Sequence, residues 1–272
     1  MLDLLEAVRF DGRIRPEHGK TEPWLVCGQN VKGGDEVEVV MKVSGSCDSG
    51  VKALIVEALS AALAADLGLP VPEPFLVSLS PQFLASVTDS SARAIGAKSS
   101  QIAFGSKRIE NCSVLLPFTK LNKQQLVEAA NIFAFDGGIE NPDRRNDKPN
   151  CLISNDKLTI IDHELAFSVA CGLILFTRIV PWKLGGLSSF ANGESAHLFF
   201  GNLKGNNHLD FSDYIQRWKS LNDGRLNAYL SAIPPAWQSH NQTAYDIVLA
   251  MKQIRDNIDG CINEVSRVLK GA

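Results

Sequence analysis

The segment from Ile139 to Phe167 constrains the fold most, because it places polar residues at both ends of two short apolar runs. The runs CLISN and LTIID predict the two strands of a hairpin. Asp143 lies in the loop before this hairpin, Asn150 directly precedes its first strand, and Asp162 directly follows the LTII run. A buried hairpin has no use for such groups at both ends. The segment therefore predicts either a turn rich in Asn, Asp and Pro or a site that binds magnesium and phosphate.

The first part of the chain predicts strands around one helix. Four short apolar runs have the composition of strands: PWLVCG, VEVVMKVSG, VPEPFLVSLS and CSVLLPFTKL. The run GVKALIVEALSAALAADLGLP predicts a helix, because its apolar residues recur at helical spacing and Gly68 with Pro70 ends it. The segment 89–106 is polar and rich in small residues, and we expect an exposed loop or a weak pair of strands there.

The second part of the chain is mainly helical. NKQQLVEAANIFAFDGGIE predicts an amphipathic helix that begins at a capping box formed by Asn122 and Gln125. Three later segments also have the pattern of helices: DFSDYIQRWKSL, GRLNAYLSAIP and TAYDIVLAMKQIRDNIDGCINEVSRVLKG. The predicted fold class is α+β with two lobes, a β-rich N-terminal lobe over residues 1–118 and a mainly helical C-terminal lobe over residues 119–272.

Composition argues against several classes of protein. The 272 residues carry a net charge of -3 and no basic run is longer than Arg144-Arg145, so direct nucleic-acid binding is not expected. Six cysteines lie far apart without a CxxC pair, which argues against a zinc ribbon and a disulfide scaffold. No amphipathic membrane-facing stretch is evident, and the start MLDLLEAVRFDGR lacks the features of a signal peptide. We therefore expect a cytoplasmic protein that does not bind membranes.

Lys42 lies within the strand run VVMKVSG, where a charged side chain needs a partner. Glu57 is the nearest acid on the predicted helix, and we expect a Lys42–Glu57 pair that fixes the ammonium over phosphate groups. The alternative is a lysine at a strand edge in water and a glutamate on the surface. Between them, Gly45, Ser46 and Gly50 form a small-residue loop at a helix N-terminus, which suits phosphate binding by main-chain N–H groups but also fits an ordinary turn.

The order of Asp143, Asn150 and Asp162 matches that of eukaryotic-type kinases. There a base Asp is followed by a metal-binding Asn and, after a hairpin, by a metal-binding Asp. The kinase pattern has the Asn five residues after the Asp, and in this chain that position is Lys148. A protonated lysine cannot bind a metal ion. We therefore assign the metal role to Asn150, which adjoins the strand, together with Asp162.

Three segments together resemble the HipA-like kinase family: VVMKVSG with the helix after it, FDGGIENPDRRNDKPNCLI and LTIIDHELAF. That family is distantly similar to the phosphatidylinositol kinases and, in fold, to the protein kinases. The resemblance covers residues 24–167 well and implies a two-lobed protein-kinase-like fold that uses ATP and Mg²⁺. It also implies that Lys42 is the ATP lysine, Asp143 the catalytic aspartate and Asp162 a metal ligand. Related sequences commonly carry Asn at the place of Lys148.

Other residues are expected to have supporting roles. We expect Leu116 and Phe118, beside the junction of the two lobes, to contact the nucleotide. Asn141, His163 and Arg144 adjoin the predicted catalytic and metal-binding residues, and we expect them to hold those side chains in place.

The resemblance favours a phosphotransferase that phosphorylates a Ser or Thr of a protein, including the chain itself. It implies a toxin–antitoxin or regulatory role, with an antitoxin or regulatory protein as partner. Two alternatives stay open. Lys148 favours a nucleotide-binding pseudokinase that serves as an interaction module. A small-molecule phosphotransferase of the aminoglycoside kinase type ranks third, because it would carry His-Gly-Asp where this chain has Asn141-Pro142-Asp143.

Overall fold

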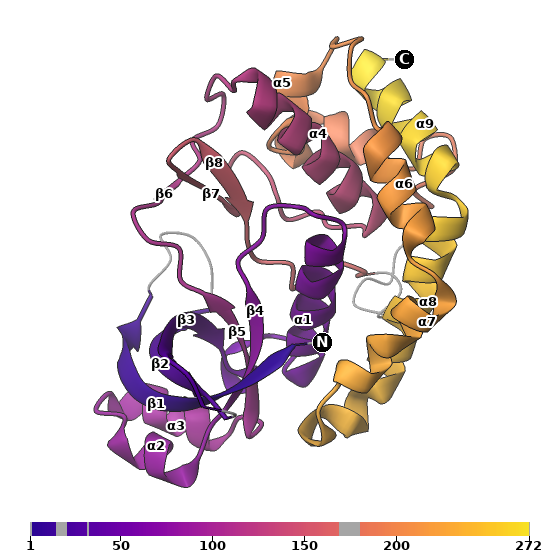
Figure 1. Cartoon of the computed structure of the whole chain (residues 1–272). Coiled ribbons are helices and arrows are strands. Elements are labelled where there is room, and N and C mark those ends of the chain that lie inside the picture. Colours follow the sequence, from indigo (N-terminus) through magenta and orange to yellow (C-terminus); the bar gives the residue numbers. More distant parts are fainter. Residues whose placement is uncertain (1, 15–20, 32, 169–179, 272) are drawn as a thin grey trace.

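The structure is a computed structural model that describes residues 2–14, 21–31, 33–168 and 180–271. Its first part contains a closed barrel of five strands in the order β1-β2-β3-β5-β4 (Figure 1). These strands are β1 (Asp3–Arg13), β2 (Trp24–Asn30), β3 (Glu36–Lys42), β4 (Pro74–Ser78) and β5 (Ile102–Lys107). β1 pairs with β4 in parallel, and the other neighbouring strands are antiparallel. Buried side chains that include Trp24, Val39 and Met41 form the core of this part.

The segment 89–106 is not the exposed loop or weak strand pair that its composition predicts. After α2 (Pro81–Ser86) it forms α3 (Ser90–Ala97), whose first turn is capped by Asp89, and then most of β5. The small residues mark close packing. A Cβ added to Gly96 would lie 2.6 Å from Leu84 Cδ2 and 2.9 Å from a ring carbon of Trp24. The packing of α3 against Leu84 and Trp24 therefore depends on glycine at a position where composition alone indicates a loop or a weak strand.

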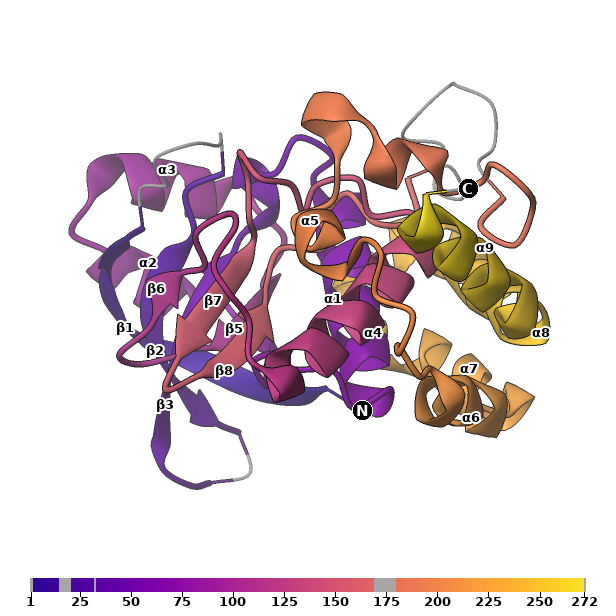
Figure 2. The same ribbon diagram turned by 90° about the horizontal axis from the view of Figure 1, so that it is seen from above.

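Helix α1 (Val51–Asp66) connects the barrel to the rest of the molecule. Figures 1 and 2 both place it between the barrel strands and helices α6 to α9. Most of its residues are buried, because it contacts β4 and β5 on one side and α8 on another. The prediction of a helix here is confirmed. A helix that is apolar on nearly all faces is typical of the centre of a core rather than its surface.

A second, three-stranded sheet has the order β6-β7-β8, with β6 (Ser113–Val114), β7 (Cys151–Ser154) and β8 (Lys157–Ile160). The last two strands confirm the predicted hairpin. The run CSVLLPFTKL is mostly not a strand, because only Ser113 and Val114 pair with β7. Beyond them Leu116 is 70% and Phe118 80% exposed, so the apolar composition of this run reflects a surface segment rather than a buried strand.

The second part of the chain is mainly helical, as predicted. α4 (Lys123–Gly138) begins at the predicted capping box, in which Asn122 and Gln125 bond each other's main-chain N–H groups. The later helices are α5 (Phe200–Leu203), α6 (Ser212–Ser220), α7 (Asp223–Ala228), α8 (Asn241–Asp256) and α9 (Ile258–Lys270). Buried side chains of α1, α4, α6, α8 and α9 share one core. Within the described ranges, no helix has the length and apolar composition that crossing a membrane requires.

Candidate active site

Lys42, the last residue of β3, lies among three carboxylates. Its Nζ is 2.7 Å from Asp162 Oδ1, 2.9 Å from Glu57 Oε2 and 3.3 Å from Glu164 Oε2. The lysine side chain is only 12% exposed, so the alternative of a strand-edge lysine in water does not hold. Burial alone would lower the pKa of Lys42, but the carboxylates of Asp162, Glu57 and Glu164 outweigh it and raise the pKa well above its ordinary value. The ammonium is therefore charged at neutral pH.

Glu57 lies midway along α1 and fixes two elements at once. Its carboxylate contacts Lys42, and both of its oxygens accept the main-chain N–H of His163 at 3.0 Å. Burial alone would raise the pKa of Glu57, but Lys42 and the His163 hydrogen bond lower it well below its usual range. The result is an ionised carboxylate that holds the end of β3 against the residue that follows Asp162.

The two predicted metal ligands occupy corresponding positions at the ends of the β7–β8 hairpin. Asn150 directly precedes β7 with φ 44°, and Asp162 follows β8 with φ 61°. Left-handed backbone costs about 1–2 kcal/mol in a residue other than glycine, although Asn and Asp tolerate it best. Arg144 helps to hold both ends, because its Nη1 donates to the main-chain oxygen of Asn150 and, at 3.1 Å, to that of Ile161.

Asp143 lies in the loop between α4 and β7, and its side chain is buried beside Lys148 and Asn150. Lys148 Nζ lies 2.5 Å from Asp143 Oδ2 and 3.8 Å from Asp162 Oδ2. Asn150 Nδ2 donates to the main-chain oxygen and to Oδ2 of Asp143, each at 3.2 Å. Partial burial lowers the pKa of Lys148, but the Asp143 hydrogen bond and the Asp162 charge raise it above its ordinary value. A lysine thus connects the two aspartates that are far apart in the sequence.

A buried polar cluster lies beneath this loop. Asp136, on α4, is fully buried and accepts hydrogen bonds from Arg144 Nε at 2.6 Å and from Asn141 Nδ2 at 2.8 Å, and His197 Nε2 lies 2.9 Å from its carboxylate. Burial opposes ionisation of Asp136, but Arg144 and His197 lower its pKa well below the usual range. Arg144 is itself buried and therefore does not present its charge to solvent, whereas its neighbour Arg145 pairs with Asp147 at the surface. The cluster fixes the loop that carries Asp143.

The predicted phosphate loop uses its main-chain N–H groups internally. Gly45 N–H donates to Ser99 Oγ at 2.9 Å, Ser46 N–H to the oxygen of Val43 at 3.1 Å, and Gly50 N–H to the oxygen of Cys47 at 3.0 Å. A Cβ on Gly45 would lie 2.7 Å from Ser99 Oγ, so this glycine permits close packing against the end of α3. Phosphate contacts by these three N–H groups stay a prediction, and they require the loop to rearrange.

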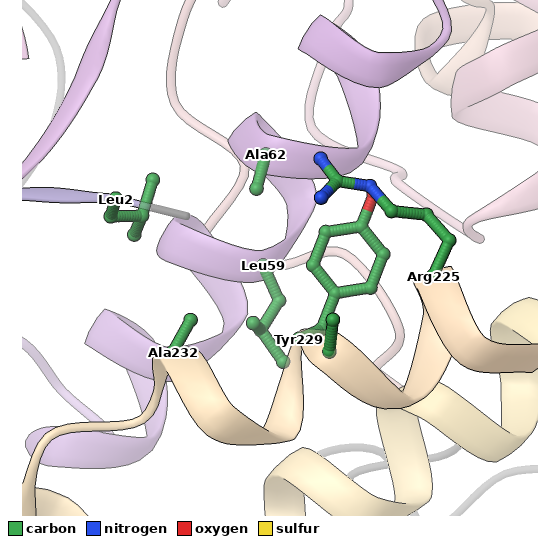
Figure 3. Close-up of a pocket in the computed structure, with 7 residues that line it drawn as sticks. Leu2, Leu59, Ala62, Arg225, Tyr229 and Ala232 are labelled. Carbon is green, nitrogen blue, oxygen red and sulfur yellow. The ribbon is translucent and has the colours of Figure 1, made fainter.

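A cavity of about 230 Å³ opens beside the charged cluster. It is lined by Thr21, Asp48, Ser49, Ala53, Lys148, Glu164 and Leu165. Leu116 and Phe118, which the sequence analysis placed at the nucleotide, are not among the lining residues. None of the predicted site residues lines this cavity or a smaller pocket of about 50 Å³ (Figure 3). The smaller pocket is lined by Leu2, Leu59, Ala62, Arg225, Ala228, Tyr229 and Ala232. Lys148, which lines the larger cavity, contacts Asp143 and Asp162. Glu164, which also lines it, contacts Lys42, so the larger cavity is the candidate substrate cleft.

The model of one protein family, described as HipA-like kinase, matches residues 13–177 of this chain. The chain belongs to the HipA-like kinase family. Among solved structures, the proinflammatory kinase CtkA of Helicobacter pylori is 11% identical with a TM-score of 0.51, and the match covers 95% of this chain and 96% of that one. The likeness to CtkA concerns the fold. The Neurospora crassa PAN3 pseudokinase is 11% identical with a TM-score of 0.35, over 97% of this chain and 64% of that one. No curated protein matches the sequence.

Three acids of this site offer oxygen ligands of the kind that a HipA-like kinase would need for magnesium. Glu57, Asp162 and Glu164 each offer a carboxylate oxygen within 4.8 Å of the other two. Carboxylate oxygens are the hard ligands that Mg²⁺ prefers in proteins. The ammonium of Lys42 contacts all three and satisfies part of their negative charge. Burial and the neighbouring carboxylates raise the pKa of Glu164 despite Lys42, which is the behaviour of an acid crowded by other acids.

Three residues of this region do not stand out in the sequence as site residues. Glu164 lies two residues after Asp162 and contacts the same lysine. Asp136 was counted as part of an amphipathic helix. The only sign of its burial in the sequence is its position between the apolar run IFAF and two glycines. His197 is distant in the sequence from Asp136, and no local pattern indicates that the two meet.

Proposed function

We propose that this protein is an ATP- and magnesium-dependent kinase with two lobes. Residues 1–118 form the ATP-binding lobe and residues 119–272 the catalytic lobe. The observation that carries the proposal is the convergence of residues from three distant segments. Lys42 of β3 lies 2.7 Å from Asp162 after β8, and Lys148 links Asp162 to Asp143 of the preceding loop. Membership of the HipA-like kinase family and a fold similar to that of a kinase support it.

Each residue has a role in transfer of the terminal phosphoryl group of ATP. Lys42, held by Glu57, contacts the phosphates, because its ammonium is fixed at the end of a strand and stays charged. Asp162 and Asn150 would hold magnesium, which when bound would supply positive charge to the phosphate oxygens. Asp143 orients the hydroxyl of the acceptor and accepts its proton.

Residues around these groups position them. His163 donates its main-chain N–H to Glu57, and Asn141 and Arg144 bond Asp136 beneath the loop. Gly45, Ser46 and Gly50 cover the phosphates after the loop opens. Leu116 and Phe118 are exposed next to the junction of the lobes, and their contact with the nucleotide requires closure of the two lobes.

The acceptor we propose is a Ser or Thr of a protein, in a cytoplasmic setting that is regulatory or of the toxin–antitoxin type. The support is membership of the HipA-like kinase family. The partner would then be an antitoxin or regulatory protein.

The test is transfer of label from γ-labelled ATP in the presence of Mg²⁺, to the chain itself and to a mixture of cellular proteins. We expect labelling by the wild type and a loss of about 10²–10⁴-fold in Asp143→Asn, the range typical of a general base. Asp156→Asn is the matched control, because the same change is made in the exposed turn of the hairpin. Equal labelling by Asp143→Asn and the wild type would refute the catalytic role of Asp143.

One observation favours a second candidate, a nucleotide-binding pseudokinase. Lys148 forms a 2.5 Å ion pair with Asp143, so the carboxylate that would accept the proton is already bonded to an ammonium group. A pseudokinase would be stabilised thermally by ATP and Mg²⁺ and transfer no label. The labelling experiment and a melting curve with ATP therefore separate the two candidates.

A further inference from the structure

Lys148 is placed where two carboxylates of the active site come together. Its Nζ lies 2.5 Å from Asp143 Oδ2 and 3.8 Å from Asp162 Oδ2. The turn that carries it is fixed, because Arg145 N–H donates to the main-chain oxygen of Lys148 at 3.0 Å. The lysine side chain is 26% exposed and lines the cavity of about 230 Å³, so the ammonium faces both the aspartates and the space available to a ligand.

In the absence of nucleotide, the charges around this position balance one divalent ion. Four carboxylates lie in the connected cluster, those of Glu57, Asp143, Asp162 and Glu164. The ammonium groups of Lys42 and Lys148 contact them. When all six groups are ionised, two negative charges are left over, which equals the charge of a single divalent cation.

Protein kinases hold two magnesium ions between the aspartate after the hairpin and an asparagine of the catalytic loop. In this protein the ammonium of Lys148, which is part of the chain, lies between Asp143 and Asp162. A second divalent ion placed near the same oxygens would be repelled by the ammonium, at short range and in partly buried surroundings where charge repulsion is strong. Asn150, whose Nδ2 bonds Asp143, would bind the single remaining ion together with Asp162, through its Oδ1.

We propose that Lys148 takes the place of one of the two divalent ions, so that this protein binds nucleotide with a single divalent cation. The inference rests on the proposed function. The lysine supplies one positive charge and three N–H donors, which suit both the aspartates and a phosphate oxygen. Unlike a metal ion, it cannot dissociate, so its charge is present at any magnesium concentration.

The test counts ions rather than activity. The full-length protein is dialysed to equilibrium against Mn²⁺ and a non-hydrolysable ATP analogue, and bound metal and bound nucleotide are measured separately. We expect about one Mn²⁺ per bound nucleotide in the wild type and about two in Lys148→Asn, which removes the charge and adds an oxygen ligand. Lys148→Arg keeps the charge and should retain one. Lys157→Asn, the same change at an exposed position of β8, should also retain one.

The outcomes separate this inference from the proposed function. Two Mn²⁺ per nucleotide in the wild type, or one in a folded Lys148→Asn, overturns the role of Lys148 while nucleotide binding stands. Absence of nucleotide binding by the wild type overturns the proposed function and the inference with it. Melting curves establish whether each variant is folded. If Lys148→Asn does not fold, the ratio in the wild type decides, since one ion supports the inference and two refute it.

Discussion

Replacing Asp136 by Ala should destabilise the protein strongly, because it leaves Arg144 buried without its carboxylate. Asp136 and Arg144 have fully buried side chains that are 2.6 Å apart. Removing one partner of a buried pair costs about 3–5 kcal/mol, since the remaining charge stays out of water. His197 and Asn141 lose a hydrogen bond as well. At about 2–4 °C per kcal/mol, we expect the melting temperature to fall by about 6–20 °C.

The assay is urea unfolding followed by tryptophan fluorescence, with the free energy of unfolding taken from the transition midpoint and slope. Lys219→Ala is the control, because Lys219 pairs with Asp259 at the surface with both side chains well exposed, and we expect a loss of at most about 1 kcal/mol. The double variant Asp136→Ala with Arg144→Met should recover part of the loss, since no unpaired buried charge is left. A loss below about 1 kcal/mol in Asp136→Ala would refute the reasoning, since it would mean that Arg144 finds other partners or water.

Two further predictions follow from the same structure. Because Arg144 and His197 hold the pKa of Asp136 below its ordinary value of 3.8 despite burial, its stabilising effect is complete above that value and is lost as pH falls through the lower folded pKa. The stability of Asp136→Asn should therefore change less than that of the wild type as pH falls from about 5 to 2. If the urea midpoints of the variant and the wild type fall equally over this range, the prediction is wrong. Gly96→Ala should lower stability by about 1–3 kcal/mol, because the added Cβ meets Leu84 and the ring of Trp24. An unchanged or higher melting temperature would show that these side chains move aside.

Local patterns were sufficient to predict much of the fold. The β7–β8 hairpin, the capping box of α4 and the apolar helix α1 each depend on residues close together in the sequence. Lys42 and Glu57 could be paired from the sequence for a physical reason, since a charge inside an apolar run must find an opposite charge.

Features that depend on distant residues could not be predicted. The composition of α3 and β5 indicates an exposed loop or a weak pair of strands, because it does not show that Gly96 and Gly105 allow close packing against other elements rather than turns. The contact of His197 with Asp136 joins two segments with no common pattern. The hydrogen bond from Gly45 N–H to Ser99 Oγ likewise could not be predicted, because it depends on where α3 ends in space.

The enclosure of α1 has a consequence for how this protein can be controlled. Protein kinases depend on a lysine–glutamate ion pair, and the position of the helix that carries the glutamate is one way in which they are regulated. Here an outward swing of α1 would expose buried side chains such as Leu54, Ile55 and Leu63, at about 1.5–3 kcal/mol for each. The Lys42–Glu57 pair should therefore persist through the working cycle, and the amide hydrogens of α1 should be among the slowest to exchange. Under the proposed function, we therefore expect control of this protein to act on the loops that face the cleft.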